Sequence, residues 1–526
     1  MIKRALPMLA LAAVLASTNM TAHAQSKGDQ ALLDALVKKG VLTEKEAQEI
    51  SAETANEVTT APAKIQVGDW VKEMKISGDL RIRNQWDQRE PMILTNPKLG
   101  PQDVNIPRDR WRFRLRLSAD FKLEGNFFGG VMLSTDDNRA ADTKNATFTG
   151  GYDAYSIFIT RAFMGWNPVP GLTFIAGKQP NPFYTTDLIY DPEVDPSGIV
   201  ERIDFDKIFN WSFGEPVAEG KESKEPVAPP PQKPGVSLEL SLIAGQFVFQ
   251  NNNADSGSTQ LKWDAYQFQE QLLARLHLGD KLTITFAPGF LSFNDASSGG
   301  TPGPHGTIVP PVSTQGLTFS QTTGGAGDTL ANSQPFPVTQ RDLNILLAPG
   351  DITYKLYGKP LSLYWDFAYN FSGNERFTRD YGPLFAHYFY VGTSPTVHFS
   401  EPWTPSLSDS LAWLVGLRFG ENKKAGDFSI SADYRQVGIA SIDPNLNSSN
   451  FALSNLNTEG WEFNAAYNFT DFLTGVLTFY YSDALTKNLY GGFATGNVPG
   501  VTSSQQFPIA RDRHDMVLQA NLLMKF

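Results

Sequence analysis

Apolar and polar residues alternate along the last eleven residues of the chain. This stretch reads MVLQANLLMKF from Met516 to Phe526; its even-numbered positions are all apolar, and its odd-numbered positions include Gln519, Asn521 and Lys525. A period of two places successive side chains on opposite faces of a β-strand. The segment therefore predicts a strand with one apolar face and one polar face.

The same alternation recurs in fifteen segments upstream. In one of them four arginines alternate with apolar residues, in the run RWRFRLRL that starts at Arg110. Strands with two different faces are what this pattern predicts. The sixteen expected strands cover residues 76–86, 110–122, 126–136, 154–167, 171–180, 200–213, 236–250, 262–278, 281–293, 341–357, 361–371, 410–420, 427–438, 458–469, 473–485 and 512–526.

The connections between these segments alternate between short and long. Tight turns such as 279–280 and 358–360 alternate with long stretches rich in Gly, Ser, Asn and Pro, such as 294–340. Short turns on the periplasmic side and long loops outside are typical of a membrane β-barrel. One connection breaks the rule, because residues 215–235 fall on the short side but are long and proline-rich. Either they form a periplasmic insertion or the strand expected over 200–213 is misassigned.

A water-soluble β-sandwich would also alternate, so alternation alone does not exclude that fold. The aromatic residues favour the barrel, since the face from Leu361 to Phe371 also carries Trp365, Phe367 and Tyr369. Sixteen faces of this kind exceed what one soluble core of this size can hold. We therefore expect an all-β fold, a transmembrane antiparallel β-barrel of about 16 strands, with about 18 as the alternative.

The amino-terminal residues are typical of export. A basic start precedes an apolar run, and Ala22-His23-Ala24 has the A-x-A pattern of a signal-peptide cleavage site. Further on, residues 29–52 predict two short helices, which form either a self-association element or a solvated tether. We expect a signal peptide over 1–24, a periplasmic helical segment and linker over 25–64, and the barrel over 65–526.

The composition limits the partners and the chemistry. The chain has no cysteine, so an exported form must be stable without disulfides, and the complete hydrogen bonding of a closed barrel provides such stability. The formal net charge of −11 becomes −13 when Lys3 and Arg4 leave with the signal peptide, which argues against nucleic acid as a partner. Motifs for phosphate binding, zinc proteases and serine hydrolases are absent, so we expect no enzyme activity, cofactor or metal.

Several runs carry a resemblance to a known family. With the signal peptide, the helix LLDALVKKGVLTEKEAQEI and the terminal strand, the runs KISGDLRIRNQW, RDRWRFRLRLSADFKLEGNFFGGVML and ITRAFMGWNPVPGLTFIAGKQPNPF resemble the Gram-negative outer-membrane putative porin family, related to the phosphate-selective porin O and P group. The resemblance implies an outer-membrane diffusion channel for small hydrophilic solutes or ions, often a homotrimer. It also implies outer-membrane lipid and the barrel-assembly machinery as partners, with Phe526 as the assembly signal.

The arginine row is the sharpest chemical feature. Its four side chains share one strand face, and they cannot face lipid because each would cost about 2–4 kcal/mol at the bilayer midplane. We expect them to line the lumen as a basic wall that attracts anions. The alternative is a structural lattice of salt bridges with inward acids. The predicted pore-lining residues are Arg81, Arg83, Arg110, Arg112, Arg114, Arg116, Arg161, Lys178 and Arg202.

The connection after the fifth expected strand is the second candidate site. It carries Asp187, Asp191, Glu193 and Asp195. Sixteen-stranded porins commonly fold the loop at this position into the pore, so the resemblance implies a constriction loop whose acids oppose the arginines across the opening. The alternatives are an external acidic loop and a divalent-cation site formed by Asp191, Glu193 and Asp195.

Two other functions stay open as alternatives. An outer-membrane barrel enzyme would need a catalytic group, and His277 falls on an inward face without an acid or serine partner that the sequence identifies. A structural or adhesive barrel would have its lumen plugged by large side chains. The expected inward faces instead carry polar residues such as Gln267, Gln269 and Gln271, which favours an open channel.

Overall fold

The computed structural model describes residues 70–89, 93–94, 106–136, 144–150, 152, 154–209, 235–250, 265–294, 343–378, 405–444, 446–452, 456–486, 509–510 and 514–526. The expected signal peptide, the amino-terminal helical segment and residues 215–234 of the proline-rich connection lie outside these ranges. No helix within these ranges is long and apolar enough to cross a membrane.

The chain divides into two compact units. The smaller unit holds the residues up to Met74 together with Phe121–Glu124. In its described part, the Glu124 amide donates to the Trp70 carbonyl at 2.9 Å, and Lys122 lies 2.8 Å from Glu73. The larger unit, Lys75–Asp120 with Gly125–Phe526, contains the rest of the described residues.

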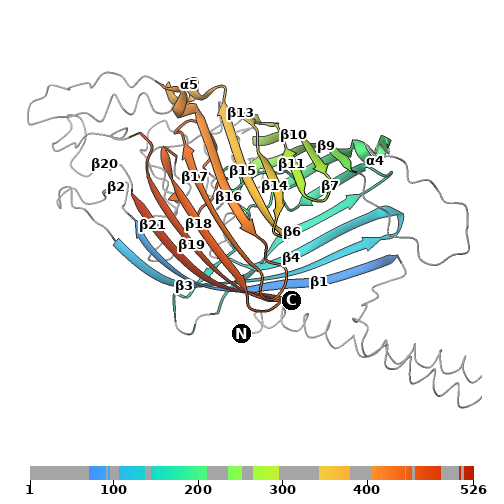
Figure 1. Cartoon of the computed structure of the whole chain (residues 1–526), viewed down its shortest axis with the longest axis horizontal. Helices are drawn as coiled ribbons and strands as arrows, with labels where there is room; N and C mark the ends of the chain where they lie inside the picture. Colours follow the sequence, from blue (N-terminus) through green and yellow to red (C-terminus); the bar gives the residue numbers. More distant parts are fainter. Residues whose placement is uncertain are drawn as a thin grey trace, which may run out of the picture. The chain divides into compact units, whose positions relative to one another are not determined.

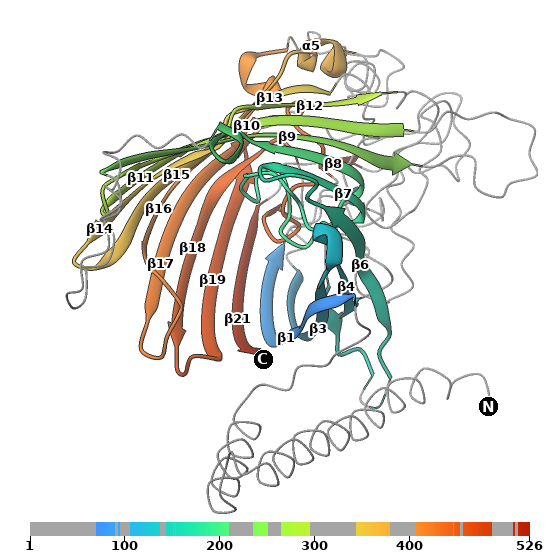
Figure 2. The same ribbon diagram turned by 90° about the vertical axis from the view of Figure 1, so that its right-hand side faces the viewer.

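The larger unit is a closed antiparallel β-barrel. Its first and last strands pair, from Asp79 opposite Lys525 to Arg89 opposite Asp515, as Figures 1 and 2 show for the blue β1 and the red β21. The strands of the described sheet are β1 (Val71–Arg89), β3 (Ile106–Leu123), β4 (Phe127–Thr135), β5 (Ala146–Thr147), β6 (Ile157–Trp166), β7 (Leu172–Lys178), β8 (Ser197–Asp204), β9 (Val236–Gln250), β10 (Ala265–Leu278), β11 (Leu282–Phe286), β12 (Gly289–Asn294), β13 (Asn344–Leu347), β14 (Gly350–Leu356), β15 (Lys359–Asn370), β16 (Leu411–Gly420), β17 (Phe428–Val437), β18 (Thr458–Asn468), β19 (Leu473–Ala484) and β21 (Asp515–Lys525).

Four short helices and one small sheet complete the described elements. The helices are η4 (Glu124–Asn126), α4 (Phe205–Phe209), α5 (Gly373–Arg376) and η6 (Leu407–Ser410). The small sheet pairs β2 (Ile93–Leu94) with β20 (Ile509–Ala510).

Two neighbouring barrel strands are each interrupted at a proline. Ala287 and Pro288 separate β11 from β12, and Ala348 and Pro349 separate β13 from β14. Proline lacks the amide hydrogen that continues a ladder. The Ala287 amide donates to the Pro349 carbonyl at 2.9 Å, so the interruptions lie side by side. With each interrupted pair counted as one strand and the two-residue β5 set aside, sixteen strands span the described sheet, and the predicted number is confirmed.

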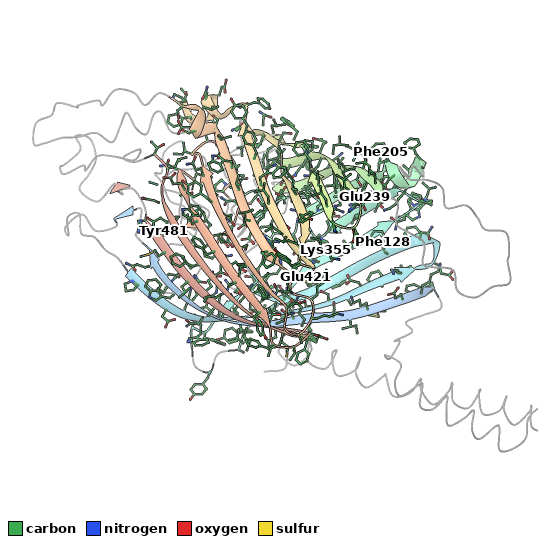
Figure 3. The ribbon with its side chains drawn as sticks, in the orientation of Figure 1. Phe128, Phe205, Glu239, Lys355, Glu421 and Tyr481 are labelled. Atoms are coloured by element: carbon green, nitrogen blue, oxygen red, sulfur yellow. The ribbon has the colours of Figure 1, made fainter. Side chains whose placement is uncertain are left out.

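The two faces of the barrel differ as the alternation predicts. On β18, Trp461 and Phe463 point outward and are 44 % and 46 % exposed, whereas Gln269 and Gln271 on β10 point inward and are at most 1 % exposed. Figure 3 shows side chains leaving both faces of the strands. A soluble sandwich buries its apolar faces between two sheets, whereas this single sheet closes on itself with apolar residues outside. Closure therefore excludes the sandwich.

Short turns join consecutive strands at one end of the barrel. Between β14 and β15, Tyr357 and Gly358 have φ of 50° and 79°, and two consecutive positive φ values are what the tightest β-hairpins require. Gly279, between β10 and β11, has φ of 65°. The tight turn predicted at 279–280 is confirmed, whereas the one predicted at 358–360 lies at Tyr357 and Gly358, because β15 already begins at Lys359.

The strand expected over 200–213 is wrong over Phe205–Phe209, and residues 210–213 lie outside the described residues. β8 ends at Asp204, and α4 follows directly. Phe205 and Phe209 stack one helical turn apart with ring centroids at 6.4 Å, and Lys207 lies 2.5 Å from Asp204. Neighbours at i and i+4 meet on a helix and not on a strand, so helical spacing replaces alternation here.

One row of paired residues on the outer face runs from the turn end of β4 to the loop end of β16. At its centre Ala244 is flanked by Glu201 and Glu270, so both carboxylates point outward near mid-height of the barrel. Among the described residues neither carboxylate has a hydrogen-bond or ion-pair partner. The row comprises Phe127, Trp166, Phe174, Glu201, Ala244, Glu270, Phe290, Leu346, Tyr369 and Leu411.

Candidate functional site in the barrel interior

The predicted arginine row lies on β3 and faces the interior. Arg112 and Arg114 are buried, whereas Trp111 beside them is 54 % exposed on the outer face. Arg110 and Arg116 share the inward face because side chains two apart on a strand point the same way. The strand thus presents its four arginines to the enclosed space.

Acids on the adjacent strand neutralise part of this row. Asp79 on β1 lies 2.8 Å from Arg114 and 2.6 Å from Arg116. Asp87, further along β1, lies 3.4 Å from Arg110. Salt bridges between inward arginines and inward acids, which the alternative of a structural lattice expects, therefore form at these pairs.

Glu193 joins two of the predicted arginines. It lies 3.1 Å from Arg81 on β1 and 2.5 Å from Arg114 on β3. Burial alone would raise the pKa of Glu193, but the charges of Arg81, Arg114 and Lys144 and a hydrogen bond from the Lys144 amide outweigh it and hold that pKa well below its usual range. Glu193 is therefore ionised at neutral pH and fastens its loop to the wall.

Asp195 is the second acid that attaches the loop to the wall, and its partners are basic residues. It lies 2.8 Å from Arg161 and 2.7 Å from Lys144. Lys178 donates to the Asp195 backbone carbonyl at 2.8 Å. Both loop acids thus contact the basic wall directly instead of facing it across an opening, and they neutralise part of its charge.

Two predicted residues stand apart from the loop acids. Arg83 is buried and donates to two neutral amides, Asn521 at 2.6 Å and Asn450 at 3.3 Å. Arg202 lies near the turn end of β8, 2.7 Å from Asp204. Arg83 therefore has neutral hydrogen-bond partners, whereas Arg202 belongs to a separate ion pair.

Residues 179–196, here called the first inner loop, connect β7 with β8 and extend to strands far from both. The Tyr184 hydroxyl donates to Asp351 on β14 at 2.6 Å, and the Tyr190 hydroxyl donates to Gln269 on β10 at 3.0 Å. Burial, together with the nearby Asp351 carboxylate, raises the pKa of Tyr184, so its hydroxyl remains a donor. The loop is thus held inside the barrel by side chains of other strands of the wall.

Asp187 of the first inner loop reaches a buried ionic cluster on β17 and β18. Arg435 lies 3.0 Å from Asp187, 2.7 Å from Asp433 and 2.7 Å from Glu462. Its guanidinium also lies over the Phe451 ring, 4.8 Å from the centroid. We did not predict this cluster from the sequence; its only signal there is that Asp433, Arg435 and Glu462 fall on inward positions.

A second segment enters the interior, and the sequence analysis missed it. Residues 438–457, here called the second inner loop, connect β17 with β18; the structure describes 438–444, 446–452 and 456–457 of them. Apolar residues of both inner loops form one buried cluster inside the barrel. The cluster includes Leu188, Ile189, Tyr190, Val194, Ile439, Ala440, Ile442, Leu446 and Leu456. These apolar residues in a connection are the signal that could have revealed the loop.

The described residues offer no metal site and little catalytic chemistry. No group of three His, Cys, Asp or Glu residues among them could hold a metal ion. Asp191 accepts from the Ser449 amide at 3.0 Å, whereas Glu193 contacts the wall arginines, so the two carboxylates have different partners. On the wall, His277 lies 3.1 Å from Thr283 and 3.4 Å from Glu239, which Figure 3 labels on β9. His277 therefore has an acidic neighbour that the sequence alone did not identify.

Comparison with known proteins gives a family match. A family model described as a putative porin matches residues 37–300, half of the chain. No curated protein matches. Among solved structures, OprB of Pseudomonas putida at high pH aligns with a TM-score of 0.41 and 9% identity, over 86% of this chain and 94% of that chain. OmpF of Salmonella typhi in complex with daunomycin aligns with a TM-score of 0.38 and 9% identity, over 88% of this chain and 100% of that chain. A triple mutant of Rhodopseudomonas blastica porin aligns with a TM-score of 0.34 and 10% identity, over 86% of this chain and 100% of that chain.

Proposed function

Because the chain belongs to the putative porin family and is an outer-membrane β-barrel channel, we propose that it works as a passive diffusion channel for small hydrophilic solutes and prefers anions. The observation that carries the anion preference is the distribution of charge on the inward faces of β1, β3, β6 and β7. Basic side chains outnumber acidic ones there, and the described hydrogen bonds of the Arg83 side chain go to neutral amides.

An anion preference follows from the physics of a basic wall. A charged lining raises the local concentration of counter-ions in a narrow, water-filled space. Passage also requires weak binding, since a solute that is held tightly does not leave. Because the loop acids neutralise some arginines, the remaining positive charge is moderate, and this suits rapid exchange. Inorganic phosphate is the first anion to test, given the resemblance to the phosphate-selective porin O and P group.

The first inner loop is proposed to narrow the channel. Its acids are tied to two different parts of the wall, Asp187 to Arg435 in the ionic cluster of β17 and β18, and Glu193 to the basic side chains of β1 and β3. A solute that passes beside the loop would meet acidic groups on one side and basic groups on the other. Such a transverse field orders water and favours polar solutes over apolar ones.

Ion selectivity in a planar bilayer tests the proposal. The purified protein is expected to give stepwise conductance, and the reversal potential in a KCl gradient is expected to indicate anion preference. Arg112→Glu combined with Arg114→Glu should shift that potential toward cations. Lys423→Glu combined with Lys424→Glu makes the same change of charge in the turn after β16 and should leave the potential nearly unchanged. An equal shift in both variants would refute a role of the arginine row.

A plugged structural or adhesive barrel is the second candidate, and one observation favours it. The apolar cluster formed by the two inner loops fills part of the interior with side chains such as Leu188 and Ile442, which are at most 2 % exposed. A well-folded protein that gives no conductance would support this candidate and overturn the channel.

A further inference from the structure

The second inner loop crosses from one part of the barrel wall to another. At its start, the Ala440 amide donates to the Asp409 carbonyl at 2.7 Å, and Asn370 at the end of β15 donates to the Ala440 carbonyl at 2.7 Å. Near its tip, Asn450 accepts from Gln519 on β21 at 2.9 Å and from Arg83 on β1. The loop therefore spans the interior between β15 and the closing strands β21 and β1.

The tip of the loop is fixed by packing as well as by hydrogen bonds. Phe451 and Ala452 form a small buried cluster with Tyr480 on β19 and Val517 on β21. The Arg435 guanidinium lies over the Phe451 ring. An aromatic ring that contacts both a cation and apolar wall residues has few alternative positions, so the adjacent Asn450 is held at a defined place inside the barrel.

The two inner loops are joined through their backbones. The Asp191 amide donates to the Leu446 carbonyl at 2.6 Å, and the Ser448 amide donates to the Asp187 carbonyl at 2.9 Å. Backbone hydrogen bonds of this kind depend on the course of both loops and not on single side chains. With the shared apolar cluster, they make the two loops one internal structure.

The contacts of the two loops complement each other around the barrel. The first inner loop bonds to β1, β3, β10, β14, β15 and β17, and the second contacts β15, β17, β19, β21 and β1. The first loop makes no described hydrogen bond to β19 or β21. That sector is the one that the second loop fills.

We propose that the second inner loop is a further size-determining element of the channel, and that Asn450 lies at the edge of the aperture where it also positions Arg83. This inference rests on the proposed channel function. In the proposed channel, the first inner loop alone does not set the opening, because it makes no described hydrogen bond to β19 or β21, and the second loop contacts both of these strands.

A cysteine-modification experiment tests this, and the absence of native cysteine makes it specific. Asn450→Cys is reconstituted in a planar bilayer, and a methanethiosulfonate reagent is added while single-channel current is recorded. We expect modification to reduce the current in discrete steps, by about half or more for a bulky reagent, because added volume at an aperture narrows it. Asn450 is half-buried, so the thiol should be reached from the lumen.

Lys423→Cys serves as the matched control, since Lys423 is 75 % exposed in the turn that Figure 3 marks with Glu421. Its modification should leave the current unchanged. An Asn450→Cys variant that conducts normally but is not modified, or that is modified by mass spectrometry without a change of current, overturns the inference. Absence of current in the unmodified wild type would instead overturn the channel function itself, so the two failures are distinguishable.

Discussion

Arg435 on β17 donates from Nη1 to Oδ2 of Asp187, 248 positions away in the chain, over a distance of 3.0 Å. This contact links the barrel wall to the first inner loop. The same guanidinium also holds Asp433 and Glu462, so three carboxylates depend on one buried cation. Removing one member of such a cluster leaves buried charge without compensation.

Arg435→Met should therefore destabilise the barrel markedly. We expect a loss of about 3–5 kcal/mol in the free energy of unfolding, because the buried Asp433 and the half-buried Asp187 and Glu462 would be left without their cation. Urea unfolding in lipid vesicles, followed by tryptophan fluorescence, measures it. Arg418→Met is the matched control, since Arg418 lies over the Tyr364 ring at 5.2 Å and should cost only about 0.5–2 kcal/mol. Similar losses in both variants would contradict the importance of the cluster.

The anchoring by Glu193 should depend on pH in a defined direction. Its folded pKa is lowered, so its contribution to stability is complete above the ordinary glutamate pKa of about 4.3 and is lost as the pH falls through the lowered folded value. Glu193→Gln should thus be less stable than wild type at pH 7, and the difference should shrink below about pH 4. Unfolding measured at several pH values checks this; a difference that grows on acidification would contradict it.

Asp191 should hold the two inner loops together. Its Oδ2 accepts from the amide and the hydroxyl of Ser449, and its Oδ1 accepts from the Glu193 amide. Asp191→Ala leaves these donors without an acceptor and should cost about 1–3 kcal/mol, with increased fluctuations of the single-channel current. Asp191→Asn retains one oxygen acceptor and should lose less. Current noise equal to wild type in the Ala variant would show that the loops do not need this link.

Glu270→Leu should stabilise the barrel in a bilayer. The Glu270 carboxylate points outward near mid-height without a partner among the described residues, and a lipid-facing acid costs less than the roughly 2–4 kcal/mol of Arg or Lys but is still unfavourable. We expect a gain of about 1–2 kcal/mol in the free energy of unfolding in vesicles.

Glu459→Leu is the control for that change. Glu459 is another outward carboxylate of the barrel, but it accepts from Tyr434 at 2.7 Å and from Gln436 at 2.9 Å. Its replacement removes satisfied hydrogen bonds and should therefore be destabilising. If both leucine variants were stabilising to the same extent, the missing partner of Glu270 would not be the cause.

The strands of the barrel could be predicted because their signal is local. Each of the sixteen expected segments overlaps a strand of the structure, and Arg112 and Trp111 lie on the opposite faces that the alternation assigned. The error over 200–213 arose where α4 follows β8 without a proline or glycine to mark the change.

The candidate site was only partly predictable. The acids of the first inner loop could be named, but their partners could not. Glu193, for example, contacts Arg81 on β1, and the two residues are 112 positions apart in the chain. The second inner loop escaped notice because the long connections of the sequence look alike, whether they leave the barrel or enter it.

The positions of the strands and the alternation of their faces could be read from the order of the amino acids, since a period of two acts between neighbours on one chain. The loops that turn inward and the charges that meet became known from the folded barrel alone. Those outcomes depend on contacts across its interior, such as Asp187 with Arg435 and Asn450 with Arg83, and such contacts exist only after the strands have brought distant residues together.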